Sequence, residues 1–233
     1  MAIQVEEADQ CRTITIDRPP VNALDHDAIL ALEGAFAAAV AERPRGGVVL
    51  TGAGSAFSAG VDTRAFVACD RATRHEIVRA ITRMVAQLVA IPVPVVAAVN
   101  GHALGGGLVL MLGGDYRLAA DKAGAKLGLT EAKAGVPFPA GPTAVITAEL
   151  APSLLRRLTL TSATLSPAEA VAADLADRLV APEALLVEAR AAAAAMAAQP
   201  AFAAVKQQVR GPLAARLANL AASGDEPFLA AFG

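Results

Sequence analysis

Several residue types are scarce in this chain of 233 residues, and each scarcity excludes a class of protein. The two cysteines, Cys11 and Cys69, lie far apart and lack the CxxC spacing or the accompanying histidines of a metal site. We therefore expect two reduced thiols and no bound metal. Lys and Arg number 20 against 22 Asp and Glu, and the net charge of -2 comes without a basic cluster, so we expect no nucleic-acid partner.

Long uninterrupted apolar runs are also missing. Residues 84–114 contain no charged side chain, but prolines and glycines interrupt them, whereas a membrane helix needs about 20 mostly apolar residues. We interpret this stretch as a buried strand, a turn and a buried helix, and we expect no membrane partner. Residues 1–7 lack the basic and apolar regions of a signal peptide, so we expect a cytoplasmic protein.

Apolar residues are abundant instead, at 55% against 18% charged residues. A chain of this length buries roughly 70–75% of its unfolded surface as one domain. Because the apolar share exceeds that of an average globular domain, we expect some of this surface to contact another subunit.

Apolar periodicity predicts strands that alternate with helices. Alternating Thr and Ile indicate a strand over 12–17, and two apolar runs indicate buried strands over 47–51 and 95–99. Apolar residues at spacings of three and four predict helices over 27–42, capped by Asp25, and over 70–90. This alternation favours an α/β core.

The chain beyond Pro142 has a helical pattern. Helix starts are predicted at Ser166-Pro167 and at Pro182-Glu183, and the second helix extends through an alanine-rich run to Gln199. Gly211-Pro212 is expected to break or kink the last helical stretch. The sequence contains no linker long enough to divide the chain.

Two glycine-containing turns follow buried strands. We expect residues 100–107, which end in Gly105-Gly106-Gly107, to form a turn from a strand to a helix N-terminus with free N–H groups. The second turn spans 52–62. Two such turns in one α/β domain can point two N–H groups at one anion, as in an oxyanion hole. The alternative for the glycine run is close packing of a helix on a strand.

Four motifs in this order resemble those of the crotonase (enoyl-CoA hydratase/isomerase) superfamily: Ser58-Ala-Gly-Val-Asp62, Asn100-Gly-His-Ala-Leu-Gly-Gly-Gly107, Asp115-Tyr-Arg-Leu-Ala-Ala-Asp121 and Gly128-Leu-Thr-Glu131. The resemblance implies a ClpP-like spiral of ββα units over residues 1–195 and a helical trimerisation region over 196–233, shorter than in relatives. It also implies a coenzyme A thioester as substrate, no separate cofactor, and a homotrimer or a dimer of trimers.

The resemblance assigns roles to individual positions. The amides of Val61 and Gly106 match the oxyanion hole, and Glu131 matches the catalytic acid/base. The remaining matched positions are substrate-binding, and Ala23 and Ala59 among them contact coenzyme A in relatives: Ala23, Ala59, Leu104, Gly105, Val109, Thr130 and Pro139. Without the resemblance, Glu131 would be interpreted as a solvated loop carboxylate.

Val109 distinguishes this chain from the hydratases it resembles, which carry a second glutamate at this position. Hydration needs an oriented, deprotonated water and a proton for the α-carbon, work that is normally divided between two carboxylates. Shifting a double bond needs only one, so we favour a Δ3,Δ2-enoyl-CoA isomerase of fatty acid metabolism. The alternatives are a hydratase-like or other crotonase reaction and a non-catalytic acyl-CoA binding protein.

Other candidate residues receive structural interpretations. His102 is expected to be structural or to face solvent, and His75, Glu149 and Asp121 are expected at the surface. Asp62 is expected to cap the segment that follows it. Because the last helix of relatives is short or absent here, we expect a more open acyl-CoA site.

Overall fold

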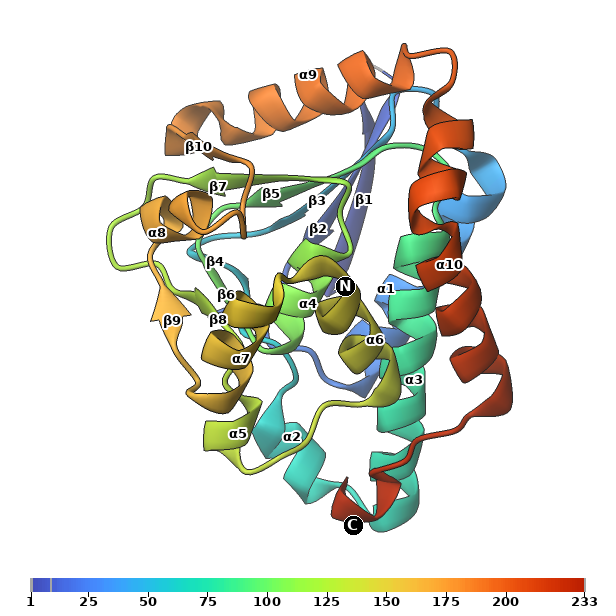
Figure 1. Ribbon diagram of the computed structural model, residues 1–233, viewed down its shortest axis with the longest axis vertical. Helices are drawn as coiled ribbons and strands as arrows, with labels where there is room; N and C mark the ends of the chain where they lie inside the picture. The colour runs from blue at the N-terminus through green and yellow to red at the C-terminus, as the bar shows by residue number, and fades with distance from the viewer. Residues whose placement is uncertain (1, 9, 233) are drawn as a thin grey trace.

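The computed structural model describes residues 2–8 and 10–232, which contain two β-sheets (Figure 1). Within these residues, the larger sheet has six strands in the order β1-β2-β3-β5-β7-β10, which are Ile3–Ala8, Cys11–Ile16, Val48–Gly52, Val95–Val99, Tyr116–Ala120 and Arg178–Val180. The smaller sheet has the order β4-β6-β8-β9, with Ala56–Ser58, His102–Leu104, Leu127–Gly128 and Thr164–Leu165.

Helices cover both sheets, so the predicted α/β class is confirmed. The helices of the described residues are α1 His26–Glu42, α2 Thr63–Ala68, α3 Arg71–Ala90, α4 Gly106–Leu112, α5 Glu131–Ala134, α6 Ala140–Glu149, α7 Pro152–Leu160, α8 Pro167–Ala172, α9 Leu185–Ala197 and α10 Phe202–Ser223. Two 3-10 helices, η1 Pro182–Ala184 and η2 Leu229–Phe232, complete the set.

Elements with strong periodicity lie where the sequence predicts them. The Asp25 side chain accepts a hydrogen bond from the amide of Ala28 and caps α1, and Asp70 caps α3 in the same way through Thr73. Strands β2, β3 and β5 match the predicted runs to within one residue. A capping box of Ser166 and Glu169 starts α8, which confirms the predicted start at Ser166-Pro167.

Three successive strand pairs are divided between the two sheets. In each of the pairs β3/β4, β5/β6 and β7/β8, the first strand enters the larger sheet and the second enters the smaller sheet. The second strands pair in parallel, β4 with β6 and β6 with β8, and a helix follows each of them. The carboxyl ends of β4, β6 and β8 therefore lie at one edge, where three loops of distant sequence meet.

Two apolar clusters lie on opposite faces of the larger sheet. The main cluster joins the sheet to α1, α3, α4 and α6, and a smaller one packs α9 on the opposite face through Leu185, Ala189 and Ala193. In Figure 1, α9 crosses the top of the view, and α3 and α10 run side by side at the right. No helix of residues 2–8 or 10–232 combines the length and the apolar character needed to cross a membrane.

Two predictions of local structure are wrong. Residues 100–107 are not a simple turn, because β6 forms within them where β4 and β8 offer hydrogen-bonding partners. The helix α10 runs for 22 residues through Pro212, so Gly211-Pro212 does not break it. Its side chains Leu213 and Leu217 are buried, and this packing offsets the hydrogen bond that proline removes.

Candidate active site

Three loops meet at the ends of β4, β6 and β8 and line one cavity of about 120 Å³. The loop after β4 contributes Ala59 and Val61, the loop after β6 contributes Gly105 and Gly106, and the loop after β8 contributes Thr130 and Glu131. Sequence positions more than 40 residues apart thus share one site because the three strands are parallel neighbours.

Two backbone amides of this cavity are free to donate. Leu24 forms a bridge beside Val61 that uses the amides of Leu24 and Asp62 but leaves the amide of Val61 without an acceptor among the described residues. Gly106 is the first residue of α4, where an amide has no partner within the helix. Two unpaired donors, one of which lies at the start of α4, favour a developing negative charge.

Gly60 lets these two amides approach each other. Its φ of +80° is a left-handed conformation that disfavours any side chain, and a Cβ there would lie 2.8 Å from the amide nitrogen of Gly106. The amide nitrogen of Val61 lies 3.7 Å from the position that a Cβ of Gly106 would take. The two glycines therefore allow the backbone segments that carry these amides to lie in contact.

Asn22 fixes the loop after β4. Its side-chain amide donates to the carbonyls of Ala53 and Ala56 at 2.9 and 2.7 Å, and its own carbonyl accepts from the Ser58 hydroxyl at 2.7 Å. The Ser58 oxygen in turn accepts from the amide of Gly60 at 3.1 Å. This buried network, to which the sequence analysis gave no role, holds the backbone that presents Val61.

Arg18 supports the same loop from the other side. Its guanidinium contacts Asp62 and Asp25 at 2.9 Å each and donates to the carbonyl of Ala23 at 2.9 Å. Asp62 accepts from the amide of Ala65 and caps α2, as predicted. The Ala65 amide and the Arg18 guanidinium together keep the pKa of Asp62 below its ordinary value.

Glu131 is the only ionisable side chain among the described residues that line the cavity. Burial raises its pKa from 4.5 to about 7, and its Oε2 atom is buried without a hydrogen-bond partner in the described chain. Gly105 makes room for this carboxylate, because a Cβ on Gly105, whose φ is +53°, would lie 3.1 Å from Glu131 Oε1. The carboxyl group thus lies close to the turn that presents Gly106.

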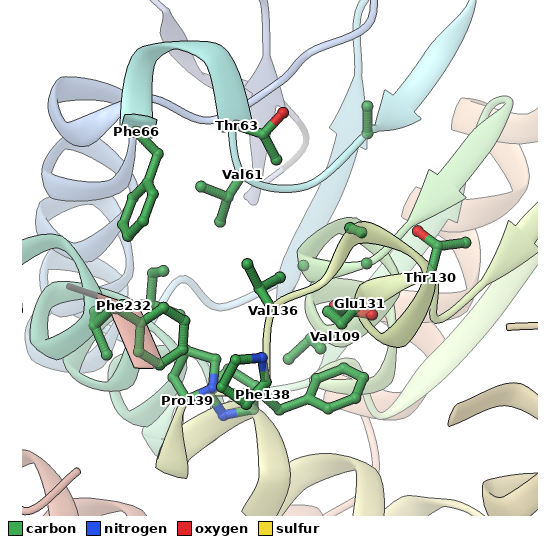
Figure 2. Close-up of a pocket in the computed structure, with 18 residues that line it drawn as sticks. Val61, Thr63, Phe66, Val109, Thr130, Glu131, Val136, Phe138, Pro139 and Phe232 are labelled. Atoms are coloured by element: carbon green, nitrogen blue, oxygen red, sulfur yellow. The ribbon is translucent and has the colours of Figure 1, made fainter. Parts of the chain in front are cut away.

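Apart from Thr63 and Thr130, apolar residues and glycines form the rest of the cavity (Figure 2). Val109 lies beside Glu131, and no second carboxylate lines this cavity among the described residues. Phe66, Phe138 and Phe232, three of the seven phenylalanines of the chain, also line it. Such a cavity suits an apolar chain attached to a group whose negative charge the amides stabilise.

The structure brings most of the residues matched by the motifs to this cavity. Eight of them line it, namely Ala59, Val61, Gly105, Gly106, Val109, Thr130, Glu131 and Pro139. Ala23 and Leu104 lie outside the lining; Ala23 accepts the hydrogen bond from Arg18, and the carbonyl of Leu104 packs against Gly60. The roles assigned to these positions stay predictions, and their placement is compatible with them.

The end of the described chain contributes to the cavity wall. Phe232 in η2 is buried and lines the cavity, whereas the expectation of a site more open than in relatives stays a prediction. Phe232 was missed because its contact with the cavity depends on the path of the chain after α10. The sequence feature that could have drawn attention to Phe232 is that it is aromatic, since aromatic residues make up only 3% of the sequence.

None of the three histidines lines this cavity. His102 lies in β6, where its Nδ1 accepts from the amide of Lys126 at 3.2 Å, in agreement with a structural role. His75 on α3 is half-buried, so it reaches the surface as predicted, although its Nε2 atom is buried. No group of His, Cys, Asp or Glu within residues 2–8 and 10–232 is arranged to hold a metal ion.

Glu149 was wrongly predicted as a surface charge. It forms ion pairs with Arg117 and, at 3.0 Å, with Arg210, which also contacts Asp115 at 2.9 Å. Lys206 binds Asp115 at 2.5 Å, and all five side chains are less than one-fifth exposed. This α10 charge cluster fixes the helix to the end of α4 and the start of β7. Asp121, by contrast, is exposed as predicted.

The split strand pairs place two free amides and a single buried carboxylate around one cavity. Residues 6–227 match the model of the enoyl-CoA hydratase/isomerase family, and the chain belongs to this family.

Individual relatives extend this similarity over nearly the whole chain. A probable enoyl-CoA hydratase of Mycobacterium bovis is 32% identical over 203 residues, which are 87% of this chain and 77% of the relative. An enoyl-CoA hydratase structure from Mycobacterium ulcerans has a TM-score of 0.87 at 26% identity and full coverage of both chains, 100% each. An enoyl-CoA isomerase structure from Mycobacterium tuberculosis has a TM-score of 0.84 at 26% identity, covering 96% of this chain and 97% of the other.

Proposed function

We propose that this protein is an isomerase that moves the C=C bond of a 3-enoyl-CoA thioester to the 2-position, with no cofactor besides the coenzyme A of its substrate. The observation that carries this proposal is the single carboxylate of the cavity, Glu131, beside the apolar Val109. One carboxylate is enough for a reaction in which the same proton leaves and returns.

Hydration asks for more than this cavity contains. A water molecule must be oriented and deprotonated while the α-carbon gains a proton, and two carboxylates normally divide this work. Val109 can neither accept nor donate a hydrogen bond, and it occupies the place beside Glu131 where a second carboxylate would act.

The first step of the proposed reaction is proton removal from C2. The Glu131 carboxylate takes this proton, and the electrons of the C2–H bond move toward the thioester carbonyl, whose oxygen becomes negative. The amides of Val61 and Gly106 donate to this oxygen, and each such donor is worth about 3 kcal/mol in the transition state. The resulting dienolate is conjugated over the carbonyl, C2, C3 and C4.

The second step returns the proton to C4. The protonated Glu131 donates it there, the C2=C3 bond forms, and the charge on the thioester oxygen is discharged, so that the enzyme regains its initial state. A pKa of about 7 suits a group that must both accept and donate a proton near neutral pH. The apolar lining keeps water from capturing that proton.

The relatives support a coenzyme A thioester as substrate. Their names include two different reactions, hydration and isomerisation. Several are named hydratases, and one Mycobacterium tuberculosis protein is named an enoyl-CoA isomerase in one solved structure, with a TM-score of 0.84, and a probable enoyl-CoA hydratase in another, with a TM-score of 0.85. Hydration of a 2-enoyl-CoA is therefore the second candidate, favoured by the relatives' names and opposed by Val109.

Two substrates distinguish these candidates. Purified enzyme is assayed with a 3-enoyl-CoA, following formation of the conjugated 2-enoyl thioester, and separately with a 2-enoyl-CoA, following its loss. We expect the first reaction and not the second. Substituting Glu131→Gln should slow isomerisation by roughly 100- to 10,000-fold, because it removes the positioned acid/base while keeping the side-chain size.

A matched variant controls for folding. Glu183→Gln alters an exposed carboxylate of η1 far along the chain and should isomerise like the wild type. Isomerisation that survives unchanged in Glu131→Gln would remove this residue from the mechanism, and rapid hydration of the 2-enoyl-CoA by the wild type would refute the isomerase assignment.

A further inference from the structure

The segment that follows α10 turns back across the cavity. The helix ends at Gly224, whose φ of +64° allows the chain to reverse, and η2 then packs against α3. Phe232 is buried at the end of this segment, whereas Phe228, only four residues earlier, is 64% exposed. The segment therefore directs one of its two aromatic side chains into the protein.

Phe232 forms part of the cavity wall together with Phe66. The two rings meet edge to face, with centroids 6.3 Å apart and planes at 78°. Figure 2 shows Phe66 and Phe232 together on one side of the cavity and Glu131 on the other. The cavity extends from Glu131 to this aromatic pair.

A buried carboxylate, Glu226, holds this segment in place. One of its oxygens accepts from the Thr82 hydroxyl of α3, and the other accepts from the amide of Ala140 at the start of α6, at 2.7 Å. Thr82 Oγ1 also accepts from the amide of Gly141 at 3.1 Å. Glu226 thereby connects the segment to α3 and to the loop that ends in Pro139, another residue of the cavity wall.

We propose that Phe232 determines acyl-chain length in this enzyme by ending the cavity, and that Glu226 is the residue that positions it. This inference rests on the proposed function only in requiring an acyl thioester as the ligand. Phe232 contacts the space that additional methylene groups would need, and a rigid hydrogen-bonded attachment of its segment prevents the ring from moving aside without breaking buried hydrogen bonds.

Each methylene group of the acyl chain that becomes buried raises the binding affinity by roughly fourfold. This value sets the size of the expected effect. In the wild type, affinity should stop rising once the chain reaches the Phe66–Phe232 pair. Replacing Phe232 by alanine opens the wall, so that each further methylene contributes again. Decanoyl-CoA should then bind at least tenfold more tightly relative to hexanoyl-CoA than it does in the wild type.

Calorimetric titration with the saturated thioesters butyryl-, hexanoyl- and decanoyl-CoA measures this profile without turnover. The wild type is compared with Phe232→Ala and with the control Phe228→Ala, which removes the exposed ring of the same segment. The control should keep the wild-type profile. Phe232→Trp enlarges the side chain and should weaken hexanoyl-CoA more than butyryl-CoA, which gives a second test if the alanine variant folds poorly.

A profile in Phe232→Ala that equals the wild-type profile would overturn this inference and leave the proposed reaction intact. Absence of any acyl-CoA binding by the wild type would overturn both. Isomerase assays are separate, so a failure of isomerisation with normal length-dependent binding would contradict the proposed function alone.

The positioning role of Glu226 has its own variants. In Glu226→Ala, as in Phe232→Ala, the affinity for decanoyl-CoA should rise relative to that for hexanoyl-CoA. The affinity for butyryl-CoA should change by less than about twofold. Glu226→Gln keeps a carbonyl acceptor and should restore much of the wild-type profile. An equal loss of affinity for all three thioesters in Glu226→Ala would instead indicate a merely structural role and overturn the assignment.

Discussion

Burial of Glu131 raises the pKa of its carboxyl group and thereby lowers the stability of the folded protein at neutral pH. Its carboxyl group has a pKa of about 7 in the folded protein and an ordinary value of 4.5 when the chain is unfolded. Below pH 4.5 both states hold the proton, so no cost arises. Between 4.5 and 7 the unfolded state releases its proton first, stability falls as the pH rises, and above 7 the loss is complete, at roughly 3 kcal/mol.

Glu131→Gln should therefore become more stable than the wild type as the pH rises. The difference in free energy of unfolding should grow by up to about 3 kcal/mol between pH 4.5 and pH 8, because glutamine has no proton to lose. Urea denaturation of both proteins at several pH values measures it. A difference that does not change with pH would show that burial of the carboxylate has no such effect.

The residues of the candidate site that could be identified from the sequence lie within or next to a local motif. Glu131 lies in one of the four motifs and Val109 lies two residues after another, and both line the cavity. Asn22, Glu226 and Phe232 were not recognised, because the contacts that give them these roles join residues 31 or more positions apart in sequence and no local pattern encodes those contacts. Local residue patterns report caps and periodicity, whereas these three side chains take their roles from long-range packing.

At the scale of elements, α10 is held by charge as well as by apolar packing. Arg210 donates to the carbonyls of Gly113 and Gly114 at 3.1 and 3.0 Å and contacts both acidic members of the α10 charge cluster, Asp115 and Glu149. Lys206 and Arg117 complete the pairing. Removing one member leaves buried carboxylates with fewer partners, which costs more than the pair itself contributes.

Arg210→Ala should therefore destabilise the protein by about 3 kcal/mol. Arg216→Ala, in the same helix but at an exposed position, is the matched control and should change stability by less than about 0.5 kcal/mol. Chemical denaturation of the two variants measures the contrast. Equal stabilities would show that the α10 charge cluster does not hold the helix.

Three of the elements that were not predicted from the sequence are short. Strands β4, β6 and β8 have three, three and two residues and exist because they pair with one another across the chain. Longer elements such as α1, α3 and β5 carry enough periodic residues to be predicted. The site lies at the ends of the short strands, so the part of the fold that matters most for chemistry was the least predictable.

At the scale of the whole molecule, apolar side chains remain exposed on α9 and α10. Val187 is 72% exposed, and Val205 and Val209 are 50% and 74% exposed one helical turn apart. From the high apolar content of the sequence we expected some apolar surface to contact another subunit, and these three residues provide such a surface. We propose that they contribute to contacts between subunits of a homotrimer or a dimer of trimers.

Val209→Asp should weaken this assembly, because a charge would have to be buried at the contact. Sedimentation velocity should then give a smaller particle than the wild type. Leu160→Asp changes a residue of α7 that is 75% exposed and is the control. A wild type that sediments as a monomer, or a Val209→Asp variant that sediments like the wild type, would contradict the proposed contact.

Because each strand pair is divided between two sheets, the residues that pair the strands of the larger sheet are separate from the residues that line the cavity. Strand pairing depends on backbone hydrogen bonds within β3, β5 and β7, whereas Val61, Val109 and Glu131 lie in the segments that follow the second strands. A single substitution at such a position leaves every strand register intact. The architecture therefore allows the side chains that line the cavity, Val109 among them, to be replaced without any change in how the strands pair.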